Sequence, residues 1–233
     1  MIHPRALQSR RKFLGGLAAG ALAGGATPKF LSATERNRIH ALVRQTHQSA
    51  NDQVQLAVVG AGGMGMADVE TALTVPGVKL VAVADCFDGR LEAARERYGR
   101  DLFTTRDYRE VLARDDVDAV ICGTPDHWHK KISVEALRAG KSVYCEKPMV
   151  HSIAQGGDVV RAQNESGKTF QVGSQGMSSL GNEKAKELLA AGKIGELNYA
   201  EGFWARNDPI GAWQYAIPDD ASEKTVDWEM FLG

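Results

Sequence analysis

A glycine-rich run at residues 60–65, Gly-Ala-Gly-Gly-Met-Gly, carries the clearest chemical signal in this sequence. It follows an apolar stretch at 53–59, which predicts a buried strand, and it opens a predicted helix at 64–73. A second predicted strand, 78–84, ends immediately before Asp85. Glycines between a strand and a helix, with an acid about 20 residues later at the end of the next strand, predict a dinucleotide-binding βαβ unit.

Each residue of the run has a physical role in such a unit. Gly60 permits a tight exit from the strand, and Gly62 lets backbone N–H groups approach a pyrophosphate. Gly65 lets the helix pack closely on the sheet. Gly63 and Met64 begin the helix, whose unpaired N–H groups and positive dipole end would bind the phosphates. The alternative is a glycine-rich turn in an α/β fold that binds no ligand.

Asp85 is the residue expected to select the cofactor. Its carboxylate would accept hydrogen bonds from both hydroxyls of the adenosine ribose, and its charge would repel the additional phosphate of NADP. The sequence therefore favours NAD over NADP. Arg90, five positions later, is the feature that weighs against this preference.

The segment 123–129, Gly-Thr-Pro-Asp-His-Trp-His, follows the fourth predicted strand. It lies at the carboxyl edge of the expected sheet, where open α/β folds bind ligands. Thr124 and Asp126 are also common helix caps, so capping is the alternative role for both. His127 and His129 are two positions apart and cannot share a helix face, which argues against a metal site formed by the pair.

The tripeptide Glu146-Lys147-Pro148 follows the fifth predicted strand. A lysine at this point would face the same crevice, where it could hydrogen-bond a substrate hydroxyl and assist proton loss as a hydride departs. Pro148 restricts the turn and makes a cis Lys147–Pro148 bond possible. The alternative interpretation is an ordinary surface turn.

The composition is that of a globular protein, with 43% hydrophobic and 24% charged residues and a formal net charge of −1. Basic residues dominate positions 1–50 and acidic residues dominate the remainder, which argues against nucleic-acid binding. Cys86, Cys122 and Cys145 lack the spacing of metal ligands, so no metal site is expected. We expect small buried side chains at these positions, with a disulfide left open.

Residues 1–50 predict a signal peptide and linker rather than part of the fold. Ser9-Arg-Arg-Lys-Phe-Leu14 resembles the twin-arginine export signal, and a weakly apolar run follows at 13–26. That run is shorter than the roughly 20 residues that span a bilayer as a helix. We therefore expect recognition by the twin-arginine export machinery and a periplasmic or otherwise exported protein. A disordered basic tail is the alternative.

The remaining elements alternate as in a doubly wound parallel sheet. Further helices are expected at 91–98, 107–113, 127–139 and 153–166, and further strands at 102–104, 118–122, 142–145 and 169–172. This pattern predicts an α/β Rossmann domain at 51–173. A helix at 183–191 and a strand at 196–205 predict the incomplete start of a second mixed α/β domain at 174–233.

Together these features resemble the glucose-fructose oxidoreductase/inositol dehydrogenase/rhizopine catabolism (Gfo/Idh/MocA) family. The resemblance covers roughly 51–233 and rests on residues 60–65, Asp85, 124–129, 146–148, 172–175, 192–197 and 225–233. It implies a Rossmann domain followed by a mixed α/β domain that holds the substrate pocket and mediates homo-oligomers. The implied substrates are sugars, cyclitols and their derivatives, oxidised or reduced at a carbinol carbon with NAD(P).

The resemblance also implies roles for individual residues. Lys147 is implied as a catalytic or substrate-orienting residue, and Glu146 as a contact of the nicotinamide ribose. Thr124, Pro125 and His129 are implied to line the cofactor cleft. The family usually takes an acid–base pair from its second domain, at positions beyond residue 233.

The leading interpretation is an exported NAD-dependent oxidoreductase that acts on a sugar, cyclitol or glycoside. Because an exported enzyme has no free NAD pool, we expect tightly bound cofactor that is regenerated in each cycle. A redox-neutral NAD-dependent glycosidase fits the same constraint. A non-catalytic nucleotide- or sugar-binding module is the alternative from another class.

The export hypothesis makes a direct prediction. Changing both Arg10 and Arg11 to Lys should leave the protein in the cytoplasm, because the paired guanidinium groups define the signal. Cell fractionation measures the outcome, and cofactor binding by the purified variant should be unchanged. Normal export of the double variant would contradict the hypothesis.

Overall fold

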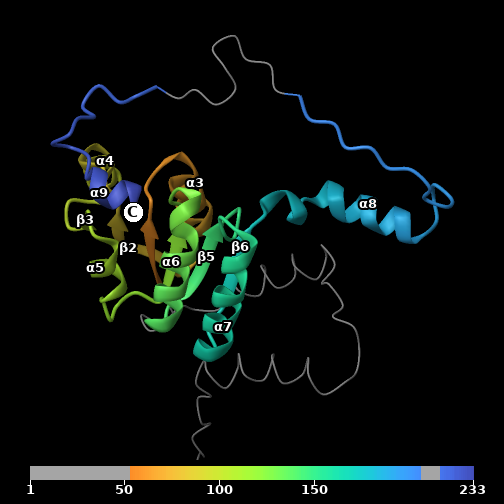
Figure 1. Ribbon diagram of the computed structural model, residues 1–233, viewed down its shortest axis with the longest axis horizontal. Coiled ribbons are helices and arrows are strands. Elements are labelled where there is room, and N and C mark those ends of the chain that lie inside the picture. Colours follow the sequence, from red (N-terminus) through yellow and green to blue (C-terminus); the bar gives the residue numbers. More distant parts are fainter. Residues whose placement is uncertain (1–52, 206–215) are drawn as a thin grey trace, which may run out of the picture. The chain divides into compact units, whose positions relative to one another are not determined.

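The structure is a computed structural model that describes residues 53–205 and 216–233 (Figure 1). The predicted signal peptide and linker at 1–50 lie outside the described residues, so the export hypothesis stays a prediction. Within the described ranges, no helix combines the length and apolar character that crossing a membrane requires.

A single six-stranded parallel sheet of order β3-β2-β1-β4-β5-β6 organises the fold. The strands are β1 (Val54–Val59), β2 (Val78–Ala84), β3 (Phe103–Thr105), β4 (Ala119–Cys122), β5 (Ser142–Glu146) and β6 (Phe170–Gly173). This confirms the expected doubly wound Rossmann sheet. The strand order reverses between β1 and β4, and such a reversal opens a crevice at the carboxyl ends of the strands.

Helices cover both faces of the sheet because each central strand is apolar on both sides. They are α3 (Gly63–Leu73), α4 (Asp88–Tyr98), α5 (Tyr108–Leu112), α6 (Asp126–Arg138), the short η2 (Ile153–Gln155) and α7 (Gly156–Ser166). One buried core includes Val69 of α3 and Leu91 of α4. The other includes Val111 of α5, Ile132 of α6 and Val159 of α7. Figure 1 shows α6 and α7 packed side by side.

Three glycines bring the loop after β1 against the loop after β4. Gly60 has a positive φ of 89°, which favours glycine, and a Cβ there would lie 2.7 Å from the backbone of Gly123. A Cβ on Gly65 would lie well under 3.0 Å from the carbonyl oxygen of Gly60. The start of α3 can therefore rest on the sheet only because side chains are missing at these positions.

The chain after β6 differs in part from the prediction. It forms η3 (Gln175–Ser178) and α8 (Leu180–Ala190), close to the expected helix. The expected strand at 196–205 is wrong, since this segment has no regular secondary structure. Its apolar residues alternate, but a strand also needs a hydrogen-bonding neighbour, and none of the described strands pairs with it. Leu197 and Tyr199 are accordingly exposed.

The last described segment returns to the sheet. Val226 forms an isolated antiparallel bridge with Phe87, three residues after the end of β2, and α9 (Trp228–Leu232) follows. The Asp227 carboxylate caps α9 by accepting the Met230 N–H at 2.9 Å. This bridge joins parts of the chain far apart in sequence, and periodicity did not predict it.

The glycine contact can be tested by adding one methyl group. Gly65→Ala should lower the free energy of unfolding by on the order of 3 kcal/mol, because the new Cβ meets rigid backbone. Gly63→Ala is the matched control in the same turn, since a Cβ there meets nothing within 4 Å. Urea denaturation measures both, and equal effects of the two substitutions would contradict the packing role.

Candidate functional site

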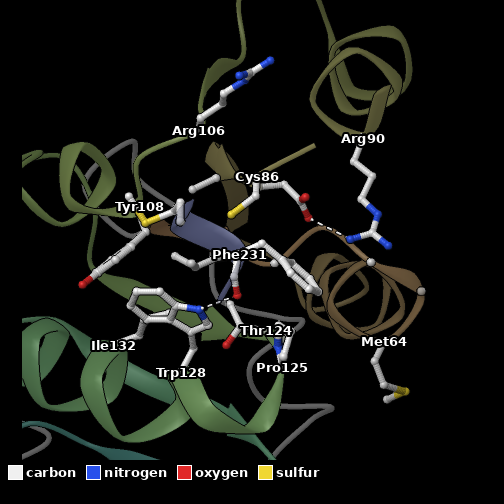
Figure 2. Close-up of a pocket in the computed structure, with 18 residues that line it drawn as sticks. Met64, Cys86, Arg90, Arg106, Tyr108, Thr124, Pro125, Trp128, Ile132 and Phe231 are labelled. Carbon is white, nitrogen blue, oxygen red and sulfur yellow. Dashed lines mark hydrogen bonds and ion pairs between the residues drawn. The ribbon is translucent and has the colours of Figure 1, made fainter. Parts of the chain in front are cut away.

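A cavity of about 270 Å³ opens at the carboxyl edge of the sheet (Figure 2). Its walls come from the loops after β1, β2 and β4 and from α3, α4, α5, α6 and α9. Ligand sites usually measure about 300–1,000 Å³, so this cavity is sized for part of a dinucleotide rather than for all of it. The sequence-predicted residues that line it are Gly60, Gly62, Gly63, Met64, Asp85, Thr124 and Pro125. Gly65, His129, Glu146 and Lys147 are not among its lining residues.

The beginning of α3 is arranged to bind an anion. Gly62 is the N-cap residue and provides no side-chain hydrogen bond to the first turn. The N–H groups of Gly63 and Met64 precede the first bond of the helix, which runs from the Met66 N–H to the Gly62 carbonyl. Because both residues border the cavity, these donors are available to a phosphate there.

Asp85 supports the glycine loop from the end of β2. Its carboxylate is buried, and it accepts the Ala61 N–H at 2.7 Å and the Phe87 N–H at 3.0 Å. Arg90 on α4 reaches the same carboxylate at 3.3 Å (Figure 2). The carboxylate thus fixes the position of the loop as well as lining the cavity. Its predicted bonds to a ribose stay a prediction.

The loop after β4 is not arranged as a side-chain helix cap. Pro125 occupies the N-cap position of α6, and no side chain caps that helix. This rules out the capping alternative considered for Thr124 and Asp126. The Thr124 hydroxyl instead lies 3.4 Å from the Cys122 sulfur, and the Thr124 side chain borders the cavity (Figure 2).

His129 is buried beneath this loop and links it to the next one. Its Nε2 lies 2.9 Å from the Thr124 carbonyl oxygen, and its Nδ1 lies 2.6 Å from the Pro148 carbonyl oxygen. Carbonyl oxygens only accept, so this geometry favours a ring that carries protons on both nitrogens, an imidazolium. Burial disfavours this charge, but hydrogen bonds to Cys145 and to the two carbonyls outweigh it and raise the pKa of His129 to about 9.

Two cysteines surround the same ring. Cys122 and Cys145 are partners in the register of β4 and β5, and their sulfurs and a ring nitrogen of His129 lie within 4.8 Å of one another. Sequence spacing did not reveal this cluster, because the register of two strands creates it. A metal ion would need a free lone pair on the ring, and both nitrogens are already engaged. The cluster is therefore a hydrogen-bonded core.

A second polar group lies at the end of β5. The buried Glu146 carboxylate accepts a hydrogen bond from Gln175, which also reaches Asp68 on α3 at 3.4 Å. Burial and the charge of Glu146 raise the pKa of Asp68 to about 6. Gly173 leaves room for this carboxylate, since a Cβ there would lie well under 3.0 Å from its oxygen. Sequence reasoning missed Asp68 and Gln175 as partners of Glu146, because nothing in the spacing joins α3 to η3.

Lys147 follows Glu146 and is exposed at this carboxyl edge. Its peptide bond to Pro148 is cis, as the sequence allowed. The predicted residues thus separate into those around the cavity and those after β5, with His129 buried between the two loops.

A parallel sheet of this order, with an uncapped glycine-rich helix start at the point of reversal, defines a dinucleotide-binding Rossmann protein. The model of one family, described as an oxidoreductase family with an NAD-binding Rossmann fold (GFO_IDH_MocA), matches residues 54–174. The chain belongs to this Gfo/Idh/MocA family of oxidoreductases.

Characterised relatives differ in their named reactions. The chain is 36% identical over 162 residues to the inositol 2-dehydrogenase of Rubrobacter xylanophilus, which covers 69% of this chain and 46% of that protein. It is 34% identical over 152 residues to the scyllo-inositol 2-dehydrogenase (NAD(+)) of Bacillus subtilis, covering 65% and 44%. It is 32% identical over 164 residues to the 2,7-anhydro-N-acetylneuraminate hydratase of Mediterraneibacter gnavus, covering 69% and 43%. The chain spans less than half the length of these relatives.

Solved structures agree in fold. The myo-inositol 2-dehydrogenase of Lactobacillus plantarum aligns with a TM-score of 0.58 at 25% identity, over 62% of this chain and 43% of that one. A 3-ketoreductase from Actinomadura kijaniata, solved with NADP, aligns with a TM-score of 0.57 at 26% identity, over 62% and 44%. Structural similarity therefore does not separate NAD from NADP.

The imidazolium of His129 predicts a pH-dependent stability. Because its pKa is raised from 6.5 to about 9, its contribution is fully present below pH 6.5 and is lost as the pH rises through about 9. The stability difference between the native chain and His129→Gln should fall by on the order of 3 kcal/mol over that interval. Denaturant titrations at several pH values measure it, and a constant difference would contradict the charged ring.

Proposed function

We propose that this chain forms the cofactor-binding part of an NAD-dependent oxidoreductase that acts on a carbinol of a sugar or cyclitol. The supporting observation is the uncapped start of α3 beside Asp85 at the point where the strand order reverses. The inositol dehydrogenases among the relatives suggest the substrate class. We assign residues 51–173 to the cofactor domain and 174–233 to the start of a second domain for substrate and homo-oligomer contacts.

The described residues around the cavity fit the phosphate and ribose part of a dinucleotide. Gly62, Gly63 and Met64 line the cavity, no side chain caps the start of α3, and a Cβ on Gly63 would meet nothing within 4 Å, so the first turn of α3 is open to a phosphate. Gly62, Gly63 and Met64 would hold the pyrophosphate, and Asp85 the adenosine ribose. A nicotinamide ring bound in this crevice would accept a hydride from the carbinol carbon.

The chain's own contribution to the reaction is centred on Lys147. Its side chain would hydrogen-bond the reacting hydroxyl and lower the barrier to proton loss. Glu146, whose carboxylate accepts a hydrogen bond from Gln175, would contact the nicotinamide ribose. The Thr124 and Pro148 carbonyls, tied to one ring, would keep the two loops at a fixed separation.

Asp85 should give the site a preference for NAD. Asp85→Ala should weaken NAD binding by about 1–3 kcal/mol, the loss expected for charged hydrogen bonds. It should also reduce the difference in affinity between NAD and NADP. Asp85→Asn is the matched control, because it keeps an acceptor for the Ala61 N–H but removes the charge. Calorimetric titration with both nucleotides measures the effect. A native chain that prefers NADP would contradict the assignment and point to Arg90.

Lys147 should matter for the reaction and not for cofactor binding. In the enzyme with its substrate domain, Lys147→Ala should slow cyclitol- or sugar-dependent reduction of NAD by about 10²–10⁴-fold, the usual effect of losing an acid–base group. NAD affinity should stay within about twofold, because backbone donors hold the phosphates. Lys147→Arg keeps the charge but not a titrating amine, so it should also be slow. Unchanged activity in both variants would contradict the catalytic role and favour the interpretation of residues 146–148 as an ordinary surface turn.

A redox-neutral reaction is the second candidate. The hydratase among the relatives is named for a reaction that adds water, and a retained cofactor would suit such a cycle. The state of the bound nucleotide after turnover distinguishes the two. Accumulated NADH supports the dehydrogenase, and a cofactor that returns to NAD⁺ with cleavage or hydration of the substrate supports the redox-neutral reaction.

A further inference from the structure

The segment 225–233, here called the C-terminal strap, is joined by its first residues to the end of β2. The Asp88 N–H donates to the Thr225 carbonyl at 2.9 Å, and the Asp227 N–H donates to the Cys86 carbonyl at 2.8 Å. These two bonds flank the bridge between Phe87 and Val226. The strap therefore adds a short antiparallel partner to the loop that follows Asp85.

The other end of the strap is held by the first turn of α6. The Trp128 indole Nε1 donates to the Phe231 carbonyl at 3.1 Å, and the His127 Nε2 lies 3.1 Å from the same oxygen. That carbonyl belongs to the last turn of α9, where no helical N–H is left to bond it. The strap thus crosses from the end of β2 to the start of α6, and Figure 2 shows Phe231 between Cys86 and Thr124.

The two faces of α9 differ. Met230 and Phe231 line the cavity, with Phe231 still 36% exposed, whereas Trp228 and Leu232 do not line it and are 47% and 68% exposed. Across the cavity are the apolar side chains of Tyr108, Trp128 and Ile132. The strap therefore completes a partly apolar chamber whose polar lining includes the Asp85 carboxylate and the side chains of Arg90 and Arg106.

We propose that the C-terminal strap closes the adenosine half of the cofactor site, with Phe231 and Met230 forming the surface against which the adenine ring packs. This proposal rests on the proposed NAD site. A pyrophosphate at the start of α3 and a ribose at Asp85 place the adenine beyond Asp85, in the gap that the strap crosses. A flat apolar base fits the aromatic and thioether side chains there.

Such a strap would act mainly on the rate of exchange. The adenine would be held between α9 and α6, so opening of the bonds to Cys86, Asp88 and Trp128 would speed release of the cofactor. The nicotinamide end, on the β5 side of the site, would be untouched. This gives a physical route to a retained cofactor.

The test uses the whole chain loaded with NADH, mixed with excess NAD⁺ while NADH fluorescence is followed. Phe231→Ala should speed dissociation by about 5- to 150-fold, the range for losing one base–aromatic contact. Leu232→Ala is the matched control on the exposed face of α9 and should keep the native rate. Binding of ADP-ribose should weaken with Phe231→Ala, whereas binding of nicotinamide mononucleotide should not.

A second pair of variants tests the strap at Asp227, a residue that does not line the cavity. Asp227→Ala removes the cap of α9 and should also speed dissociation, and Asp227→Asn should restore the native rate because Asn caps equally well. Circular dichroism confirms that each variant is folded.

A native dissociation rate in both Phe231→Ala and Asp227→Ala would contradict the proposed role of the strap without contradicting the proposed NAD site. Tighter binding by Phe231→Ala would also overturn it, since the ring would then compete with the cofactor. A native chain that binds no NADH would overturn both proposals.

Discussion

The contact between the loops after β1 and β4 is the constraint on which the rest of the site depends. Gly60, Gly65 and Gly123 meet there at distances that no side chain would allow. This contact fixes the start of α3 against the sheet, so its free N–H groups face the crevice. Asp85 then holds the glycine loop from the other side through the Ala61 N–H. A site for an anionic cofactor follows from backbone geometry, and few side chains are needed to form it.

Most of the fold could be predicted because its signals are local. Apolar runs bounded by turn residues predicted the parallel strands, and the glycine run with Asp85 predicted a loop and a carboxylate that line one cavity. The prediction of a strand at 196–205 was wrong because strand formation is not local: it depends on a pairing partner that alternation along the sequence cannot supply. The cluster of Cys122, His129 and Cys145 was hidden because it depends on the register of β4 with β5.

The site residues also divide into those that local sequence predicts and those that depend on contacts between distant segments. Spacing pointed to the residues around the cavity, because a βαβ unit places them by rule. It could not join Asp68 to Glu146 through Gln175, since these side chains come from three separate elements. Nor could it show that Phe231 lines the same cavity as Asp85. Contacts of this kind depend on where long connections return to the sheet.

The charged ring of His129 has a consequence for how the pH dependence of the proposed reaction would be interpreted. Its ring joins the Pro148 carbonyl, next to Lys147, to the loop that borders the cavity. A loss of activity in alkaline solution would ordinarily be assigned to a lysine that loses its proton. Here the same pH range would also release one of the two carbonyls held by His129. An apparent pKa of about 9 would then report the loss of a contact between two loops, through a buried ring that does not line the cavity.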